Sequence, residues 1–241
     1  MAQRLKEKRA LITGGTRGIG LAIALQFARE GAAVALLSRN PENLEEGCRT
    51  VLQHVRGATV TAVRAHVDDR EEVTEAVGKA IDALGGLEIL VNSAGRSSLG
   101  DIDKMPPEVW ERIVSVNLMG TYYATRAAWP HLKEHGGGSI INISSGSGRR
   151  AHAGWSAYCA SKFGVMGLTD ALQKEGRPHG IRVNVICPGP TDTDQRRANF
   201  PNEDRRQLLR PADVARAAVY FASDESYWVS GPGIDVRRDP I

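Results

Sequence analysis

Short runs of β-branched and aliphatic residues alternate with longer amphipathic stretches along almost the whole chain. The first short run covers residues 9–13, and Ile19, Ile23 and Phe27 then recur every four residues until Gly31. An apolar residue every fourth position is typical of a helix that buries one face, and glycine commonly follows the end of a helix. Strands that alternate with helices in this way form parallel sheets with crossover helices. The sequence therefore predicts an α/β fold.

The alternation continues to the carboxyl end and predicts about seven strands. Later strands are expected at residues 32–38, in a run ending near 67, and at 87–92, 139–144, 181–187 and 233–236. Helices are expected at 41–57, 69–85, 107–134, 156–176 and 211–223. Asp69 and Glu72 have the spacing of a capping box. No low-complexity or Ser/Pro-rich linker separates the halves, so we expect one doubly wound, three-layer α/β/α domain over residues 1–241. Its cofactor half is expected at about 1–135 and its catalytic and substrate half at about 136–241.

Composition excludes several classes of protein. The 241 residues are 41% hydrophobic, enough for a sizeable core, and the net charge of +3 is too small and too scattered to indicate a nucleic-acid partner. No secretory signal and no apolar run near the ~18 residues of a membrane span is apparent, so we expect a cytoplasmic protein without a membrane partner. The three cysteines lack CxxC or metal-ligand spacing, which favours reduced thiols and no metal site.

A glycine-rich turn, TGGTRGIG at residues 13–20, lies where the first strand becomes the first helix. Gly14, Gly18 and Gly20 would let the backbone approach a pyrophosphate, whose charge the amino end of the helix stabilises. Thr16, Arg17 and Ile19 belong to the same expected cofactor contact. The alternative is a purely structural turn, but the position between a strand and an amphipathic helix favours a dinucleotide site.

The residues that close the second strand predict which dinucleotide binds. An acidic side chain there would accept hydrogen bonds from the adenosine ribose, whereas this chain has Ser38 and Arg39. Two guanidinium groups, those of Arg39 and Arg17, favour the 2′-phosphate of NADP(H). The alternative is that both are ordinary surface arginines. Asp68, after the third strand, is placed to accept from the adenine amino group or to cap a helix.

Over nearly its whole length the chain resembles the short-chain dehydrogenase/reductase family, and in particular its NADP(H)-dependent members of the 3-oxoacyl-[acyl-carrier-protein] reductase type. The matching motifs are TGGTRGIG, NSAG at 92–95, NLMG at 117–120, INISS at 141–145, YCASK at 158–162 and PGPTDT at 188–193. The resemblance implies a Rossmann-type fold, a nicotinamide cofactor and a catalytic set of Asn117, Ser145, Tyr158 and Lys162.

The chemistry of carbonyl reduction independently supports this catalytic set. A hydride donor must be matched by a proton donor at the carbonyl oxygen, and tyrosine can supply that proton without adding a charge. Lys162 lies one helical turn after Tyr158, where its charge would favour the phenolate. Lowering the tyrosine pKa by roughly 3 requires about 4 kcal/mol. Ser145 can hydrogen-bond the substrate oxygen.

The remaining site assignments are implied by the resemblance. Lys162 would also hold the nicotinamide ribose, and Asn117 would anchor a water that connects Lys162 to solvent. The cofactor floor is expected at Asn92, Ala94 and Gly95, and the nicotinamide end is expected at Pro188, Gly189, Thr191 and Thr193. Two segments depart from the family pattern: NSAG replaces NNAG, and GIDVRRDPI replaces the usual Asp-Gly-Gly turn. The second departure puts the contacts of the oligomer in question.

Substrate-facing residues are expected in two segments. The loop between Ser145 and Tyr158 carries Arg149, Arg150, His152 and Trp155, of which Trp155 favours an apolar or aromatic ketone and the arginines are interpreted as surface residues. Residues 191–210 form a polar, Arg-rich stretch that is interpreted as a flap over the site rather than a solvated loop. His131 and His135 have i, i+4 spacing without a third ligand and are expected at a solvated helix end.

The predicted function is an NADPH-dependent carbonyl reductase or alcohol dehydrogenase that transfers hydride between the nicotinamide and a small-molecule ketone, possibly a 3-oxoacyl thioester. The sequences GGGS and PHGI stand where carrier-protein-docking relatives have arginines, which weakens that substrate. The alternatives are an NAD-linked alcohol or polyol dehydrogenase and a non-enzymatic dinucleotide sensor. The family also implies a homotetramer or homodimer formed through residues 123–129 and 163–172.

Overall fold

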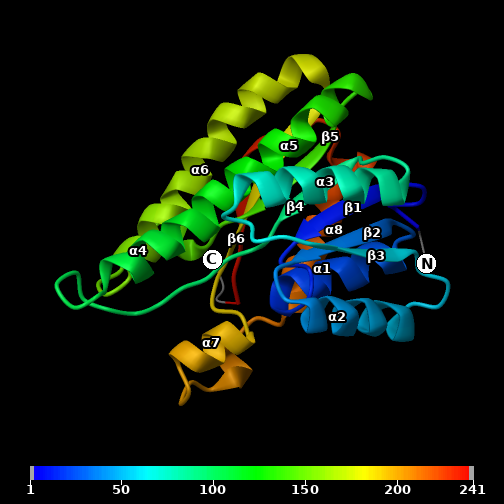
Figure 1. The fold of residues 1–241 in the computed structure, drawn as a ribbon. Helices are drawn as coiled ribbons and strands as arrows, with labels where there is room; N and C mark the ends of the chain where they lie inside the picture. Colours follow the sequence, from blue (N-terminus) through cyan, green and yellow to red (C-terminus); the bar gives the residue numbers. More distant parts are fainter. Residues whose placement is uncertain (1–2, 239–241) are drawn as a thin grey trace.

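Seven parallel strands form one continuous sheet in the computed structural model, which describes residues 3–238 (Figure 1). The strands are β1 (Arg9–Thr13), β2 (Ala33–Ser38), β3 (Val60–Arg64), β4 (Ile89–Asn92), β5 (Gly138–Ile143), β6 (Ile181–Pro188) and β7 (Gly231–Val236). Their order across the sheet is β3-β2-β1-β4-β5-β6-β7, and every pairing is parallel. This confirms the predicted doubly wound, Rossmann-type fold.

Helices cover both faces of the sheet. The main ones are α1 (Gly18–Arg29), α2 (Pro41–His54), α3 (Arg70–Leu84), α4 (Pro107–Val114), α5 (Gly120–Glu134), α6 (Ser156–Gly176) and α8 (Pro211–Ala222). Residues of α1, α2 and α8 share one buried cluster with the sheet, whereas residues of α3 and α5 belong to the cluster on the opposite face (Figure 1). Helix α6 packs on β6 beside that second cluster.

The strands are apolar on consecutive residues because both faces of the sheet are covered. In β1, Ile12 packs into the cluster with α1 and α8, and its neighbour Leu11 packs into the cluster with α3 and α5. In β2, Leu36 and Leu37 divide in the same way, and all four side chains are fully buried. This two-sided burial is the usual reason that parallel strands read as continuous apolar runs.

The two halves proposed from the sequence share this single sheet. β4 from the first half pairs with β5 from the second, in a register that sets Asn92 opposite Asn142. The Asn92 side-chain amide donates to Asn142 Oδ1 at 2.9 Å and to Thr125 Oγ1 at 3.0 Å, so a buried polar contact accompanies the backbone ladder. The extent of the domain over residues 1–241 remains a prediction.

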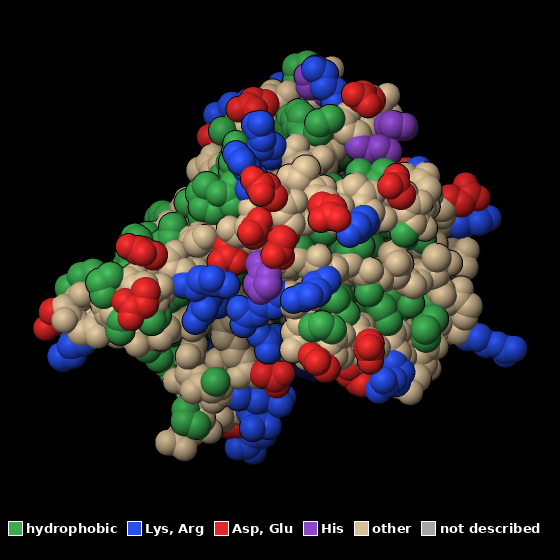
Figure 2. All heavy atoms as spheres, in the orientation of Figure 1, with side chains coloured by type: hydrophobic (Ala, Val, Ile, Leu, Met, Phe, Trp, Pro, Cys, Tyr) green, Lys and Arg blue, Asp and Glu red, His purple; other side chains and the backbone are tan. Residues whose placement is uncertain are grey.

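The layer formed by α5 and α6 carries exposed apolar side chains. Tyr122 on α5 has an exposed fraction of 38%, and Phe163 on α6 has one of 45%. Figure 2 shows hydrophobic side chains spread along this side of the molecule. Tyr123 and Trp129, in contrast, are partly buried against the core of the sheet.

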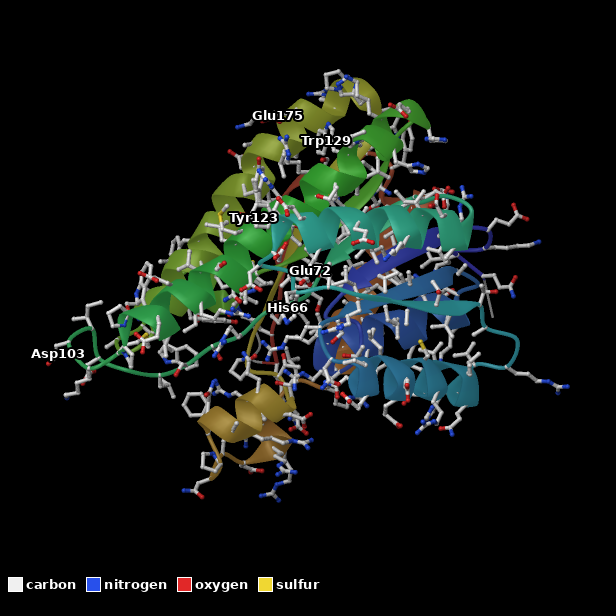
Figure 3. The ribbon with its side chains drawn as sticks, viewed as in Figure 1. His66, Glu72, Asp103, Tyr123, Trp129 and Glu175 are labelled. Atoms are coloured by element: carbon white, nitrogen blue, oxygen red, sulfur yellow. The ribbon has the colours of Figure 1, made fainter. Side chains whose placement is uncertain are left out.

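The predicted capping box at the start of α3 is only half correct. Asp69 caps the helix, since its carboxylate accepts from the backbone amides of Glu71 and Glu72 at 2.9 and 3.0 Å. The Glu72 carboxylate instead accepts from the His66 backbone amide at 2.7 Å and contacts His66 Nδ1 at 2.9 Å (Figure 3). Glu72 therefore holds the loop after β3 rather than the N-cap residue.

The long helix predicted over residues 107–134 is present but contains an irregular turn. Residues Ser115–Met119 form a π-helical segment between α4 and α5. Asn117 lies inside this segment and is fully buried. Such wide turns in otherwise regular helices are frequent at functional sites, and the helix irregularity considered for Asn117 is confirmed.

The expected solvated helix end is only half correct: His135 is exposed at the end of α5, but the partly buried His131 has a structural partner. Its Nε2 accepts a hydrogen bond from the Leu87 backbone amide at 3.1 Å, which ties α5 to the segment before β4. Its ring stacks on that of the exposed His135 with 4.0 Å between centroids. Burial, followed by the neighbouring His135, lowers the pKa of His131, so the ring serves as a structural acceptor.

No helix within residues 3–238 is long and apolar enough to span a membrane.

Candidate active site

A cavity of about 750 Å³ opens at the carboxyl edge of the sheet, next to the point where the strand order reverses between β1 and β4. Crevices of this kind are the usual ligand sites of open α/β sheets. The cavity is lined by the glycine-rich turn, the ends of β2 and β5, the loop after β4, the start of α6 and residues 188–200. Figure 2 shows Lys and Arg side chains gathered around the hollow.

The glycine-rich turn is packed so closely that side chains would not fit. Gly14 has a φ of 64°, and a Cβ there would lie 2.8 Å from the Ala94 Cα, across the crevice between β1 and β4. A Cβ on Gly20 would lie 2.1 Å from the Gly14 carbonyl oxygen. Helix α1 begins at Gly18, and Arg17 at its N-cap supplies no side-chain acceptor. The amino end of the helix is thus left to stabilise an anion in the cavity.

The floor of the cavity is fixed to β1 by one hydroxyl group. Thr13 Oγ1 accepts from the backbone amides of Ser93 and Ala94, both at 3.1 Å. This fork holds the small residues Ser93, Ala94 and Gly95 against the glycine-rich turn, and all three line the cavity. Small residues on both walls leave the crevice between β1 and β4 open to a ligand.

The far end of the slot is cationic. Ser38 and Arg39 at the end of β2 line the cavity together with Arg17. Arg64, at the end of β3, donates from Nε to the Arg39 carbonyl oxygen at 3.2 Å. Asp68 also lines the cavity, but its carboxylate is paired with Arg112 of α4 at 2.9 Å. The residues present therefore fit a nicotinamide dinucleotide, since they combine a glycine turn, a free helix amino end and arginines.

Tyr158 and Lys162 line the other end of the same cavity from adjacent turns of α6. The Lys162 Nζ lies 5.7 Å from the centroid of the Tyr158 ring and donates to the Ile143 carbonyl oxygen at 2.8 Å. Ser144 Oγ donates to the Lys162 carbonyl oxygen at 3.0 Å. These two bonds join α6 to the end of β5 and hold Lys162 in place.

Burial favours the neutral forms of both Tyr158 and Lys162. The pKa of Tyr158 is raised, chiefly because the phenol is desolvated, although the Ser145 side chain and the Arg196 guanidinium act in the opposite direction. The pKa of Lys162 is lowered to about 8, again chiefly by desolvation. The lowered tyrosine pKa expected from the sequence is therefore not found in the protein alone, because desolvation of the phenol outweighs the groups that favour the phenolate.

Ser145 lies two residues beyond β5, at the beginning of a short 3₁₀ turn, Gly146–Gly148. Its Oγ accepts from the Ser147 backbone amide at 3.1 Å, and its backbone is extended. Ser145, Tyr158 and Lys162 all line the cavity. The structure thus brings together three of the four residues predicted to be catalytic.

Asn117, the fourth, lies behind the cavity wall. Its Oδ1 accepts from the Arg96 backbone amide at 2.8 Å, and its Nδ2 donates to the Arg96 carbonyl at 3.0 Å and to Ser161 Oγ at 2.9 Å. A Cβ on Gly95 would come within 3.5 Å of Asn117 Oδ1 and 3.7 Å of Lys162 Nζ. Asn117 therefore connects the loop after β4 to α6 beside the lysine.

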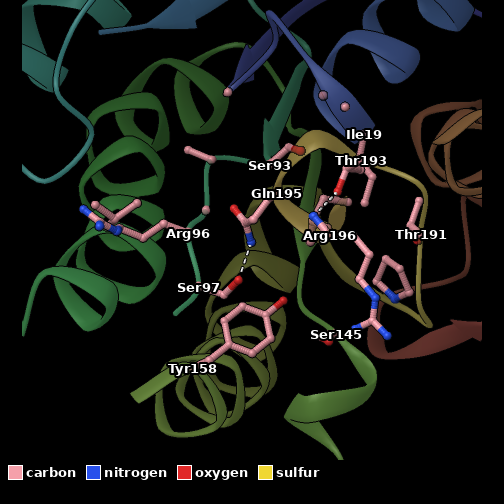
Figure 4. A pocket seen from close by; sticks show the side chains of 18 of the residues that line it. Ile19, Ser93, Arg96, Ser97, Ser145, Tyr158, Thr191, Thr193, Gln195 and Arg196 are labelled. Atoms are coloured by element: carbon pink, nitrogen blue, oxygen red, sulfur yellow. Dashed lines mark hydrogen bonds between the residues drawn. The ribbon is translucent and has the colours of Figure 1, made fainter. Parts of the chain in front are cut away.

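The predicted flap lies over the substrate end. It contains α7 (Asp194–Asn199), whose first turn is capped by Thr193: the Thr193 Oγ1 accepts from the Arg196 backbone amide at 3.2 Å. A parallel bridge between Thr191 and Leu209 closes its base. The Phe200 ring stacks on Trp155 with 5.9 Å between centroids. Figure 4 shows α7 facing Tyr158 across the pocket.

The short chain dehydrogenase family model matches residues 8–204. The 2,5-dichloro-2,5-cyclohexadiene-1,4-diol dehydrogenase of Sphingobium indicum is 37% identical over 98% of this chain and 97% of its own length. The 3-oxoacyl-[acyl-carrier-protein] reductase of Thermotoga maritima is 34% identical over 97% of each chain. Carveol dehydrogenase from Mycobacterium avium, solved in complex with NAD, superposes with a TM-score of 0.89 at 30% identity over 97% of each chain.

The protein belongs to the short-chain dehydrogenase family. It is an oxidoreductase that acts on alcohol or carbonyl groups, and its family uses nicotinamide dinucleotides. The predicted cofactor residues of this short-chain dehydrogenase line the cavity, with one exception. They are Gly14, Thr16, Arg17, Gly18, Ile19, Gly20, Ser38, Arg39, Asp68, Ala94, Gly95, Tyr158, Lys162, Pro188, Gly189, Thr191 and Thr193. The exception is Asn92, which is buried beneath the floor with Thr125 and Asn142.

The loop between Ser145 and Tyr158 largely follows the sequence expectation. His152 and Trp155 line the cavity of the short-chain dehydrogenase, whereas Arg149 and Arg150 do not, in agreement with their interpretation as surface residues. Arg149 instead donates to the Asp235 carboxylate at 2.6 Å, which ties the loop to β7. Sequence reasoning missed Ser97 and the flap residues Gln195, Arg196, Asn199 and Phe200. For the flap residues, an available signal was the i, i+4 spacing of Gln195 with Asn199 and of Arg196 with Phe200, after a threonine in N-cap position.

Replacing the buried Lys162 with methionine is expected to stabilise this short-chain dehydrogenase at pH 7. Because its folded pKa is about 8 instead of 10.5, folding keeps an unfavourable charge buried below pH 8. The buried charge lowers the free energy of unfolding by about 3 kcal/mol at most. This destabilisation disappears as the pH rises from about 8 to 10.5, because in that range the unfolded chain still binds the proton and the folded chain has lost it.

Urea denaturation at pH 7 and pH 10 measures this difference. The gain of Lys162→Met over the wild type should be present at pH 7 and shrink at pH 10. Lys174→Met, on the exposed face of the same helix, is the control and should show no such pH dependence. Equal responses of the two variants would contradict the buried-charge explanation.

Proposed function

We propose that the protein is an NADP(H)-dependent oxidoreductase that interconverts a secondary alcohol and a ketone. The observation that carries this proposal is the continuity of one cavity, which runs from the glycine-rich turn and Arg39 to Tyr158, Ser145 and Lys162. A dinucleotide bound along it would have its phosphates at the amino end of α1 and its nicotinamide beside the tyrosine. The cytoplasm is the compartment we propose, on the sequence grounds given above.

The bound cofactor would supply or accept the hydride, and the residues of the chain handle the proton and the geometry. The Tyr158 hydroxyl donates a proton to the carbonyl oxygen during reduction and accepts it during oxidation. The Ser145 hydroxyl holds that oxygen beside Tyr158. Lys162 keeps a positive charge near the phenol. The hydroxyl groups of a bound cofactor ribose would compete with the Ile143 carbonyl oxygen for hydrogen bonds from its ammonium. Asn117 holds the Arg96 loop and Ser161 in place behind the lysine.

The preference for NADP(H) over NAD(H) rests on charge at the end of β2. Ser38 and Arg39 stand where an acidic side chain would repel a phosphate, and Arg17 lines the same cavity; Asp68 also lines it but is paired with Arg112. A 2′-phosphate would pair with both guanidiniums. The carveol dehydrogenase relative was solved with NAD, so NAD linkage is the competing outcome.

The substrate we propose is a small, largely apolar ketone or secondary alcohol, with a ring as the preferred shape. Trp155 and Phe200 form an aromatic wall next to Tyr158, and the Sphingobium relative is a dehydrogenase of a cyclic diol. A 3-oxoacyl thioester remains a further candidate through the Thermotoga reductase. The residues at the expected carrier-protein docking places, GGGS and PHGI, do not favour an acyl carrier protein.

Tyr158→Phe is expected to lower kcat/KM for ketone reduction by a factor of about 10²–10⁴, because the general acid is removed. The measurement is NADPH oxidation with a ketone panel, alongside NADPH binding by fluorescence, which should be retained. Tyr227→Phe removes an exposed hydroxyl from a residue that does not line the cavity and is the matched control. An inactive wild type, or a fully active Tyr158→Phe protein, would favour a dinucleotide sensor instead.

Arg39→Ala is expected to reduce kcat/KM for NADPH by about 10- to 100-fold, the value of one charge-assisted contact to a phosphate. The value for NADH should change little, because NADH lacks the 2′-phosphate. Arg49→Ala, on the exposed face of α2, removes an equal charge away from the cavity and should alter neither value. A higher kcat/KM for NADH than for NADPH in the wild type would establish the NAD-linked alternative.

We also propose that the chain forms a homodimer or homotetramer through the layer of α5 and α6. The exposed Tyr122 and Phe163 support this, since apolar side chains on neighbouring helices gain by burial between subunits. Light scattering at micromolar concentration should give two or four times the mass of the chain. A monomeric mass would contradict the proposal.

A further inference from the structure

Three polar side chains meet at the substrate end of the cavity. Ser97 Oγ accepts from Gln195 Nε2 at 2.7 Å and from Asn199 Nδ2 at 2.8 Å. Gln195 and Asn199 are one turn apart on α7, so they present both amides to the same hydroxyl. All three residues line the cavity that contains Tyr158. Figure 4 shows Ser97 between Gln195 and Tyr158.

The triplet has hydrogen-bonding capacity that the protein does not use. Within residues 3–238, no protein partner is found for the Ser97 hydroxyl hydrogen, for Gln195 Oε1 or for Asn199 Oδ1. A serine hydroxyl and two primary amides offer donors and acceptors together. Such a group can bind either a carbonyl oxygen or a hydroxyl, and polar groups that a ligand desolvates need a partner on it.

The surroundings favour a neutral ligand with an apolar body. The Arg196 guanidinium, which also lines the cavity, is paired with the Glu203 carboxylate at 2.7 and 2.6 Å and lies 3.8 Å from the centroid of the Phe200 ring. Its charge is therefore largely compensated. The Arg96 side chain extends away from Tyr158 (Figure 4). Trp155 and Phe200 supply a flat apolar wall.

We propose that Ser97, Gln195 and Asn199 form a recognition site for a second, neutral oxygen of the substrate. The substrate class is then a hydroxyketone, a diketone or the corresponding diol, in which one oxygen reacts at Tyr158 and the other binds the triplet. The inference rests on the function proposed above and specifies its substrate. A carbonyl oxygen would accept from the Ser97 hydroxyl, and a substrate hydroxyl would donate to Gln195 Oε1 or Asn199 Oδ1, so the bonds within the triplet are kept.

The test compares ketones that differ only in the second oxygen. Reduction of cyclohexanone, 4-hydroxycyclohexanone and 1,4-cyclohexanedione is measured in the wild type, Ser97→Ala and Asn199→Leu. The two variants should lower kcat/KM for the oxygenated ketones about tenfold more than for cyclohexanone. For each variant, the fold loss in kcat/KM for an oxygenated ketone is divided by the fold loss for cyclohexanone. This ratio cancels the different intrinsic reactivities of the ketones.

Each substituted residue has a matched control of the same residue type nearby in the chain. Ser98→Ala and Asn202→Leu remove the same groups from positions that do not line the cavity, and they should leave the ratio unchanged. 1,4-Cyclohexanediol should also inhibit the wild type more strongly than cyclohexanol, and the difference should shrink about tenfold in Ser97→Ala.

Each other outcome has a distinct meaning. An equal loss for all three ketones in Ser97→Ala and Asn199→Leu would show that the triplet only holds α7 in place, and would overturn the inference while leaving the proposed function intact. Unchanged kinetics in both variants would overturn it as well. Failure of the wild type to reduce any of the ketones with NADPH or NADH, in contrast, would count against the proposed function and the inference with it.

Discussion

The reversal of strand order between β1 and β4 is the constraint on which the rest of the site depends. Neighbouring crossovers leave in opposite directions there, so a crevice opens at the carboxyl ends of these strands. The crevice is narrow because Gly14 approaches the Ala94 backbone and Thr13 binds the amides of Ser93 and Ala94. A side chain at Gly14 would therefore both strain the turn and fill the slot.

The reactive end is built at an energetic cost. Lys162 is buried, and desolvation lowers its pKa to about 8, while the same environment raises that of Tyr158. Sites that keep perturbed groups in a dry cavity commonly give up stability for chemistry. Two hydrogen bonds between α6 and the end of β5 offset part of this cost. Lys162 Nζ donates to the Ile143 carbonyl oxygen, and Ser144 Oγ donates to the Lys162 carbonyl oxygen.

Much of the fold and the cofactor site could be predicted because both depend on local patterns. Apolar periodicity gave the strand and helix order, and the glycine spacing gave the turn, since few sequences allow such close backbone contacts. The interpretation failed where a side chain had two possible partners. Glu72 binds His66 instead of the N-cap, and His131 accepts from the Leu87 backbone amide. Those choices depend on which distant segment lies within reach.

The sequence by itself determined the α/β class, the glycine-rich turn and the Tyr158–Lys162 pair, because each is encoded within a few neighbouring residues. Only the tertiary structure decided what faces the substrate. It turned Arg149 toward Asp235, placed Asn92 below the floor and brought Ser97 to Gln195 and Asn199, which lie about a hundred residues later in the chain. Contacts across such separations are set by the packing of whole elements, and no local pattern carries that information.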